Sequence, residues 1–537
     1  MASTYVSDAR TKFIDYALIA ICLAGVFIMF EIRNFAYFRD YSITFEGAYR
    51  IFLGQVPYRD FGTPVGPGSF AIPAVFFKLF EPNWTVFLIS QQFQNACLLI
   101  AIYYILNRIY IKPVVKRVSL ILFSIFYILL LSHPWYNSTA TLLMFGSAFY
   151  ALGLTRVNIF FSGILAALCL LTKQDFGFFA FAISFLFIVL RSLDSDWIEI
   201  LPNLDIFSNN RWLPKLLINL LLFIGTVIAI ITIFVEMTSR EGFLYWFNYG
   251  QEPHIIRPLS FYSLLYGALG WAVMYIALNY NNFRLFSASL FTVVASITNS
   301  ISGLGFTHFY YIAFLPVIID ETLSLNTRHK KLVVFLVLML TTVLILKPLR
   351  NVYLIFESIK LQKPEHFFFD YRKISRPLAS FPDNLLAFSQ HTQAPSQTIE
   401  LIQQLKSIAD GRHIFTTKKD LSVLNLTELT PIYAEMGVEP PKELPLWFHT
   451  NISLFPREIK KIDNMLANGE FDIILLQGTH EGLTATYKNF ISILNANRSY
   501  VLVRTVNDSP ANATWPCEPN CQGEIYVYMK HSLKIVQ

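Results

Sequence analysis

Charged residues are scarce in this sequence. Asp, Glu, Lys and Arg make up 15% of its 537 residues, whereas a soluble globular domain carries roughly 25%. Hydrophobic residues reach 54%, 50 residues are phenylalanine, and the mean hydropathy is +0.47. The shortage of charge excludes an ordinary soluble protein and predicts an integral membrane protein.

Motifs for nucleotides and nucleic acids are also missing. The sequence has neither a Gly-x-Gly-x-x-Gly loop nor a Walker-type loop, so nucleotide chemistry has no support. No basic stripe with interleaved aromatics suggests nucleic acid, and basic connectors between apolar segments explain the net charge of +6. No ligand cluster stands out, which leaves dependence on a divalent metal open and predicts no particular cofactor.

Cysteine is rare, with five residues in two groups. Cys22, Cys97 and Cys169 lie in apolar segments and are expected to be packing residues. Cys517 and Cys521 fall in a polar region that we place outside the cytoplasm, where a disulfide is favoured. A zinc site would need two further ligands at suitable spacing, and none is evident.

Long apolar runs dominate the first two thirds of the chain. A helix needs about 20 apolar residues to cross the hydrocarbon core, and about 17 suffice where neighbours compensate. About eleven segments approach this length. They are residues 13–30, 86–107, 118–132, 139–154, 157–171, 176–190, 216–235, 260–278, 285–301, 309–323 and 332–347.

The distribution of Lys and Arg predicts the orientation, because both are retained on the cytoplasmic side. With the N-terminus inside, the basic residues fall on alternate connectors, as in 108–117 and 328–331, and the outer connectors 133–138 and 302–308 carry none. An odd number of spans then places the C-terminal part outside. We therefore expect a multi-pass protein of the bacterial plasma membrane, an all-α bundle followed by a soluble α/β domain.

Composition also predicts the domain boundaries. Residues 1–348 form the membrane domain, 349–395 a connecting segment and 396–537 the extracytoplasmic α/β domain. Within the first outer loop, residues 31–85, an apolar stretch at 69–80 is too short to span and is expected to be an interfacial or re-entrant helix. The periodicity of the C-terminal domain predicts helices at 399–408, 458–467 and 487–494 and strands at 412–416, 471–476, 500–505 and 524–529.

The first outer loop contradicts the charge rule. Its charged residues include Glu31, Arg33, Arg39, Asp40, Glu46, Arg50, Arg59 and Asp60. Four arginines on the outer side suit an anion site, since guanidinium groups bind phosphate as forks. The alternative is an amphipathic surface helix whose charges pair with one another and with lipid head groups.

The order of residues in this loop resembles the C-type membrane glycosyltransferases (GT-C). Asp40 follows the first span, Ala48 comes eight residues later, and Gly54-Gln-Val-Pro57-Tyr58-Arg59-Asp60 leads to a Gly66-Pro67 pair and an apolar stretch. The pattern is similar to the first extracytoplasmic loop of enzymes that use polyprenyl-phosphate sugars, among them protein O-mannosyltransferases and the lipid A aminoarabinose transferase. In many members Glu follows the Asp, whereas here Tyr41 does.

The resemblance implies an enzyme that moves a hexosyl or pentosyl group from a polyprenyl-phosphate carrier to a glycan, lipid or protein acceptor. Asp40 would be the general base, with Asp60 or Glu46 as a second carboxylate. Cations would bind the donor phosphate as its charge develops. The candidates are Arg39, Arg50, Arg59, Lys173 and His308 for phosphate, and Tyr58, Gln174 and Tyr310 for substrate.

Each assignment has an ordinary structural alternative. Asp40 could pair with Arg39 or cap a helix, Asp60 could hold a neighbouring arginine, and Lys173 could extend toward head groups. His308 could be an interfacial histidine. The aromatic residues of the outer loop 240–257 could stack on a sugar, yet Trp and Tyr are routine at membrane interfaces, and we favour that interpretation.

Two other functions are alternatives to sugar transfer. A transporter or flippase would be expected to carry charged residues deep inside several spans and to contain inverted repeats. The apolar segments are nearly free of charge at mid-depth, and no repeated halves are visible. A non-catalytic membrane scaffold is the third alternative.

Overall fold

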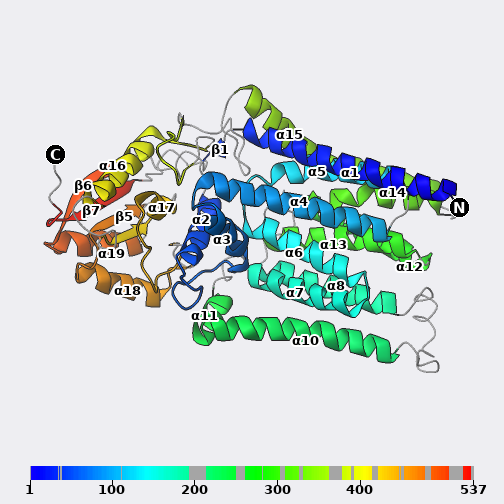
Figure 1. Ribbon diagram of the computed structural model, residues 1–537, viewed down its shortest axis with the longest axis horizontal. Helices are drawn as coiled ribbons and strands as arrows, with labels where there is room; N and C mark the ends of the chain where they lie inside the picture. Colours follow the sequence, from blue (N-terminus) through cyan, green and yellow to red (C-terminus); the bar gives the residue numbers. More distant parts are fainter. Residues whose placement is uncertain are drawn as a thin grey trace.

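The computed structural model contains two parts, a bundle of helices and a unit with a β-sheet (Figure 1). It describes residues 2–33, 35–36, 39–109, 112–192, 213–249, 261–280, 282–302, 309–325, 330–361, 378–388, 392–413, 421–427, 429–446, 448, 453–477, 485–506 and 524–533. The predicted disulfide of Cys517 and Cys521 and the candidate His308 lie outside these residues.

The helices of the bundle coincide with the apolar segments predicted from the sequence. They are α1 (Ala2–Glu31), α4 (Trp84–Ile109), α5 (Pro113–Phe126), α6 (Tyr136–Ala151), α7 (Arg156–Thr172), α8 (Gln174–Ser192), α10 (Leu213–Met237), α12 (Phe261–Asn279), α13 (Phe283–Ser302), α14 (Leu315–Ser324) and α15 (Lys330–Lys360), with the 3₁₀ turns η1 (Ile128–Leu130) and η4 (Phe309–Ala313). Among the described residues, six helices are long and apolar enough to cross a membrane. The chain is therefore a multi-pass membrane protein.

Small polar side chains join the helices inside the bundle. The Ser147 hydroxyl on α6 lies 2.7 Å from the Ser184 hydroxyl on α8 and donates to the Ser162 carbonyl on α7 at 2.9 Å. Small residues let helix backbones approach closely where lipid supplies no hydrophobic drive for association. These contacts make α6, α7 and α8 one tightly packed group.

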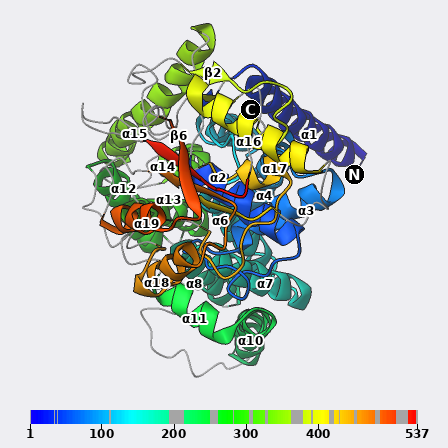
Figure 2. The same ribbon diagram turned by 90° about the vertical axis from the view of Figure 1, so that its left-hand side faces the viewer.

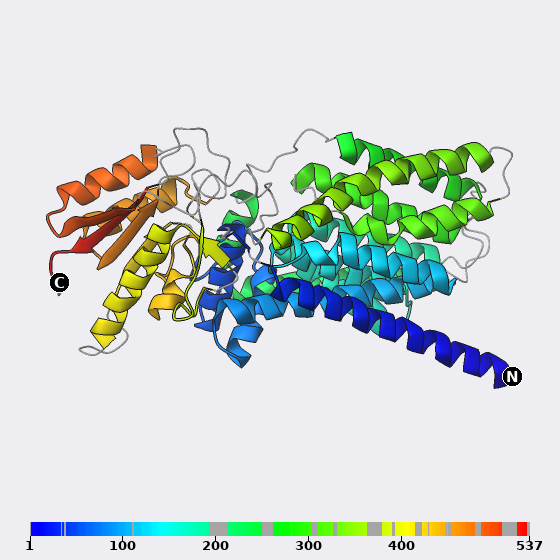
Figure 3. The same cartoon turned by 90° about the horizontal axis from the view of Figure 1, so that it is seen from above.

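Three shorter helices lie at the end of the bundle that faces the sheet unit: α2 (Arg39–Phe52), α3 (Gly68–Leu79) and α11 (Arg240–Tyr249) (Figure 1). Helix α3 covers the stretch predicted to be an interfacial or re-entrant helix, and its helical structure is confirmed. The N-terminus lies at the opposite end of the bundle (Figure 3).

The C-terminal unit is a small mixed sheet with helices around it. Its strands are β4 (Val423–Leu426), β5 (Ile473–Gln477), β6 (Tyr500–Val506) and β7 (Ile525–Lys530), in the order β4-β5-β7-β6, with β4 parallel to β5 and the other pairs antiparallel. Its helices are α16 (Ser396–His413), α17 (Ile432–Met436), α18 (Pro456–Ala467) and α19 (Ala485–Ala496), which lie in front of the bundle in Figure 2.

Most elements predicted for this unit are confirmed, and one is wrong in part. The helices expected at 399–408, 458–467 and 487–494 and the strands at 471–476, 500–505 and 524–529 are present. The strand expected at 412–416 is wrong at its first two residues, because Arg412 and His413 form the last turn of α16; residues 414–416 lie outside the described ranges. Strand β4, four residues long and fully buried, was not predicted.

A second, very small sheet ties the first loop to the connecting segment. Strand β1 (Phe35–Ala36) runs parallel to β3 (Thr392–Ala394), and β3 is antiparallel to β2 (Ala379–Ser380). The first loop is thus paired with the connecting segment, which follows the membrane domain in the sequence.

The predicted domain boundary at residue 348 falls inside α15, which continues through Pro348 to Lys360.

Candidate functional site

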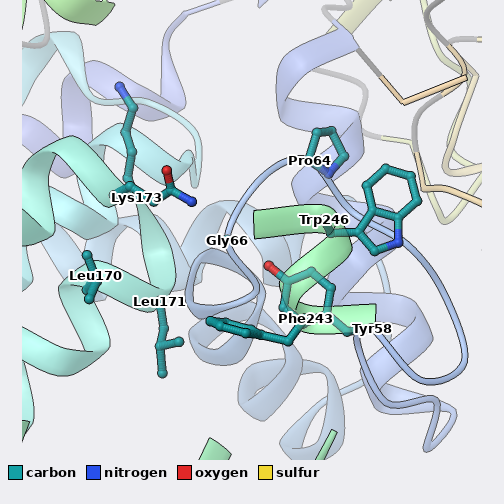
Figure 4. A pocket seen from close by; sticks show the side chains of 9 residues that line it. Tyr58, Pro64, Gly66, Leu170, Leu171, Lys173, Phe243 and Trp246 are labelled. Carbon is teal, nitrogen blue, oxygen red and sulfur yellow. The ribbon is translucent and has the colours of Figure 1, made fainter. Parts of the chain in front are cut away.

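A small pocket lies where three segments meet at the end of the bundle nearest the sheet unit (Figure 4). The first loop, the junction between α7 and α8, and helix α11 each contribute to it. The lining residues are Tyr58, Pro64, Gly66, Leu170, Leu171, Lys173, Gln174, Phe243 and Trp246. The pocket therefore brings together three of the predicted site residues, Tyr58, Lys173 and Gln174.

Glycines allow the first loop to lie directly on its neighbours. A Cβ atom at Gly66 would come within 2.3 Å of the Leu171 carbonyl oxygen, and one at Gly68 within 2.2 Å of Thr172 Oγ1. At Gly62 it would lie 2.0 Å from the Trp246 ring. Real Cβ atoms do not make such contacts, so the Gly-rich sequence of the loop is required by this close packing.

Lys173 lies between α7 and α8 in a poorly solvated position. Its ammonium is 3.3 Å from Asp175 Oδ2 and lies over the rings of Phe176 and Tyr136, at 5.1 and 5.6 Å from their centroids. Burial lowers the pKa of Lys173, and the charge of Asp175 opposes this shift. A cation with little water around it attracts an anion more strongly than one in bulk solvent.

Tyr58 enters the pocket from a strained turn. Its φ angle is +64°, in the left-handed region that residues other than glycine rarely adopt. The Tyr58 amide donates to the Phe61 carbonyl at 2.8 Å, and the ring packs edge-on against Phe234 and Phe243. Burial raises the pKa of Tyr58, so the phenol stays a hydrogen-bond donor; it points toward the α7–α8 side of the pocket, while the Lys173 side chain extends away from Tyr58 (Figure 4).

Glu46 and Arg50 pair with each other instead of lining the pocket. Arg50 Nη2 lies 2.8 Å from Glu46 Oε1, and both side chains are buried, with exposures of 0% and 1%. Burial raises the pKa of Glu46 to about 7, against the opposing charge and hydrogen bond of Arg50. The structure thus places both residues in a buried ion pair on one face of α2.

Asp60 closes the turn that carries Tyr58. Its Oδ2 accepts from the Val56 amide at 2.8 Å and from Arg59 Nη2 at 2.9 Å. Burial raises the pKa of Asp60, but the hydrogen bonds from Arg59 and Val56 outweigh it, and the pKa lies below its ordinary value. The Arg59 side chain is mostly exposed, so in this structure the pair faces solvent.

Arg39 and Asp40 form the first turn of α2, and the orientation of their side chains lies outside the described part of the chain.

Tyr310 lies in the interior of the bundle, fully buried, with its hydroxyl 3.2 Å from Thr298 Oγ1 and its ring edge-on to Phe145. Tyr310 therefore does not line the described pocket. Within the described ranges no three His, Cys, Asp or Glu residues gather as metal ligands would.

Sequence reasoning missed two aromatic residues of the pocket. Phe243 and Trp246 lie on α11, in the outer loop whose aromatic residues were interpreted as an interfacial belt. The signal was present, because aromatic faces suit sugars, but periodicity alone does not say which aromatic residues of a short helix face a neighbour and which face lipid.

Comparison with known proteins supports the fold. No protein-family model and no curated protein matches the sequence. The apo structure of ArnT from Cupriavidus metallidurans matches with a TM-score of 0.50 at 13% identity, over 98% of this chain and 100% of ArnT. ArnT bound to undecaprenyl phosphate gives 0.49 at 11%, over 97% and 99%. Archaeal oligosaccharyltransferase AglB from Archaeoglobus fulgidus, in complex with an inhibitory peptide and a dolichol-phosphate, gives 0.45 at 9%, over 90% and 72%.

The likeness to apo ArnT extends over nearly the whole length of both chains. At this level of identity it establishes the fold and no more. The predicted resemblance to the C-type glycosyltransferases is confirmed at that level.

Proposed function

We propose that this protein is a membrane glycosyltransferase that moves a sugar from a polyprenyl-phosphate carrier to an acceptor on the extracytoplasmic face. The fold shared with ArnT supports the class of enzyme. ArnT itself has been solved with undecaprenyl phosphate, and we propose a carrier of the same chemistry here. The acceptor is a glycan, a lipid or a protein.

The observation that carries this proposal is that Lys173, Tyr58 and Trp246, which come from three separate segments, line one pocket at the end of an apolar bundle. In the proposed complex, the carrier phosphate binds the Lys173 ammonium, which is held near Asp175. The sugar lies against the aromatic side of the pocket, where the Tyr58 hydroxyl is available as a donor. The polyprenyl chain extends into the membrane beside the helices.

The reaction requires a base and a stabilised leaving group. The acceptor hydroxyl attacks the anomeric carbon, the bond from that carbon to the phosphate oxygen breaks, and the phosphate leaves with the electron pair. We propose that Asp40, in the first turn of α2, takes the hydroxyl proton. Lys173 neutralises the charge that develops on the departing phosphate.

We further propose that all eleven apolar segments cross the plasma membrane, with a cytoplasmic N-terminus and the C-terminal unit outside. Six of the helices have the length and composition to do so, and four shorter apolar helices were also found among the described residues, α3 being one of them. The N-terminus and the sheet unit lie at opposite ends of the bundle (Figure 1), as an odd number of crossings requires.

The test is sugar transfer by the purified full-length protein in lipid nanodiscs, with a radiolabelled polyprenyl-phosphate sugar and an extract of envelope acceptors. Asp40→Asn is expected to lower the transfer rate by about a hundredfold or more, the usual contribution of general base catalysis. Asp410→Asn, on the exposed end of α16, is the control and should keep the wild-type rate. A wild-type protein that transfers no sugar, or an Asp40→Asn variant as active as the control, would refute the proposal.

A further inference from the structure

The C-terminal unit contacts the first loop through residues 438–446, here called the docking segment. The Glu443 amide donates to the Asp60 carbonyl at 2.6 Å, and the Leu446 amide donates to the Gly62 carbonyl at 2.7 Å. Gly62 also donates to the Leu444 carbonyl at 3.3 Å. The docking segment therefore pairs with the loop through the backbone, as a strand would.

The side chains of Arg50 and Gln55 also bind the docking segment beside these backbone contacts. Arg50 Nη1 donates to the Pro441 carbonyl at 3.0 Å, and Gln55 Nε2 donates to the Pro440 carbonyl at 2.9 Å. Arg50 Nη1 also donates to Gln55 Oε1 at 3.2 Å, and Arg50 Nε to Glu46 Oε1 at 2.9 Å. One guanidinium thus connects helix α2, the start of the turn and the docking segment.

The same turn forms one wall of the pocket. Residues 56–62 carry Tyr58 toward the pocket, and Asp60 and Gly62 bind the docking segment on the other side. The Arg50 guanidinium lies 5.3 Å from the centroid of the Phe61 ring in this turn. Gly62 is also the residue whose missing Cβ leaves room for Trp246. A shift of the docking segment would consequently move Tyr58 and Trp246, two of the three aromatic residues that line the pocket.

We propose that Arg50 and Gln55 are positioning residues, which hold the docking segment on the first loop and thereby set where Tyr58 and Trp246 stand in the pocket. This inference rests on the proposed function and assigns a role to the C-terminal unit: it completes the head-group site without touching the substrate. A buried ion pair adds little net stability once its desolvation is counted, and in some proteins it fixes geometry instead.

Arginine suits this role better than lysine. Its fork of donors reaches Glu46, Gln55 and Pro441 at the same time, whereas an ammonium has a single nitrogen. Arg50→Lys keeps the charge opposite Glu46 but cannot make all these contacts. Tyr49→Phe is a milder variant, because it removes only the hydroxyl that donates to the Val438 carbonyl at 3.3 Å.

The experiment measures binding of undecaprenyl phosphate to the full-length protein in nanodiscs and determines both Kd and the number of sites. Arg50→Lys and Gln55→Ala are expected to raise Kd about tenfold, the equivalent of one lost hydrogen bond to a charged or buried group, with the number of sites unchanged. Tyr49→Phe should raise it less. Arg504→Lys is the matched control, since Arg504 contacts only Gln404 and Glu400 of its own unit among the bonds described, and should leave Kd unchanged.

A merely structural role for Arg50 predicts a different result, fewer binding sites with an unchanged Kd, and that result would overturn the inference. A second readout does not depend on the lipid. The rate at which Lys173 reacts with a small amine-directed reagent, followed by mass spectrometry, should rise several-fold in Arg50→Lys and Gln55→Ala. If the wild type binds no undecaprenyl phosphate, the proposed function fails, and the labelling rate alone decides this inference: unchanged labelling refutes it.

Discussion

The Tyr41 ring lies flat on the His133 imidazole, with centroids 4.4 Å apart and an angle of 4° between the planes. Both residues are buried, and His133 Nδ1 is 2.8 Å from the Ser132 hydroxyl. Tyr41 is the neighbour of Asp40, in the position where many C-type glycosyltransferases have a second acid. Here Tyr41 occupies that position, and its stack on His133 packs the start of α2 against the connector that precedes α6.

The stack predicts the effect of removing the Tyr41 ring. Tyr41→Ala should destabilise the protein by about 3 to 5 kcal/mol, the usual cost of truncating a buried aromatic, and should lower the transfer rate because the turn with Asp40 loses its support. Tyr41→Phe keeps the stack and should retain most of the activity. Thermal unfolding in detergent and the transfer assay measure the two effects. Equal activity of Tyr41→Ala and Tyr41→Phe would contradict the supporting role.

Glu46 predicts a pH dependence of stability. Its pKa is raised from 4.5 to about 7 in the folded protein, chiefly by burial, with Arg50 on its own helix and Tyr433 of α17 as the groups that interact with it. A raised folded pKa contributes stability that is fully present below 4.5 and is lost as the pH rises through 7.

Between pH 5 and pH 8 the wild type should therefore lose about 2 to 3 kcal/mol relative to Glu46→Gln, which cannot ionise. His133 acts in the opposite direction, because burial and Arg33 lower its pKa to about 3, and the stability it provides is lost as the pH falls below 6.5. This contribution is common to both proteins and cancels in the difference. The measurement is the melting temperature of both proteins across this range; parallel curves would show that Glu46 does not titrate there.

Lys173 predicts how the protein binds phosphate. Lys173→Gln should raise the KM for the donor and lower kcat/KM by about 30- to 100-fold, because a charge-assisted hydrogen bond contributes about 2 to 3 kcal/mol. Lys173→Arg keeps the charge and should lose less. Lys488→Gln, exposed on α19, is the control. Donor KM values that agree between Lys173→Gln and the control would exclude phosphate binding by this lysine.

Two glycine substitutions, one in the first loop and one on α16, are expected to change the stability in opposite directions. Gly66→Ala places a methyl group against the backbone of α7, 2.3 Å from the Leu171 carbonyl, and should destabilise the protein and abolish binding at the pocket. Gly411→Ala, on α16 with open space around its Cβ position, should stabilise by about 0.5 to 1 kcal/mol. The melting temperatures of the two variants test this contrast, which fails if both shift in the same direction.

Much of the fold follows from the sequence because lipid imposes a strong local constraint. A backbone in hydrocarbon must satisfy its own hydrogen bonds, so each apolar run near the required length becomes a helix, as α1 and α10 do. The short strand β4 has no such constraint: four buried residues carry no periodicity that separates a strand from other buried segments.

The candidate site was only partly predictable, and the reason is sequence distance. Tyr58 and Lys173 could be proposed because each belongs to a recognisable local pattern. Arg50 and Pro441 are 391 positions apart in the sequence, and no sequence pattern near either residue indicates their contact. Arg50 was therefore expected to bind phosphate, whereas the structure places its guanidinium between Glu46 and the docking segment.

The most direct test of the proposed sugar transfer is a structure of the full-length protein in nanodiscs with undecaprenyl phosphate bound. We expect the phosphate within hydrogen-bond distance of Lys173 Nζ, at the pocket formed by the first loop, the α7–α8 junction and α11. Asp40 should face the position of the anomeric carbon. A head group bound at the end of the bundle that holds the N-terminus, or an Asp40 carboxylate directed away from the head group, would contradict it.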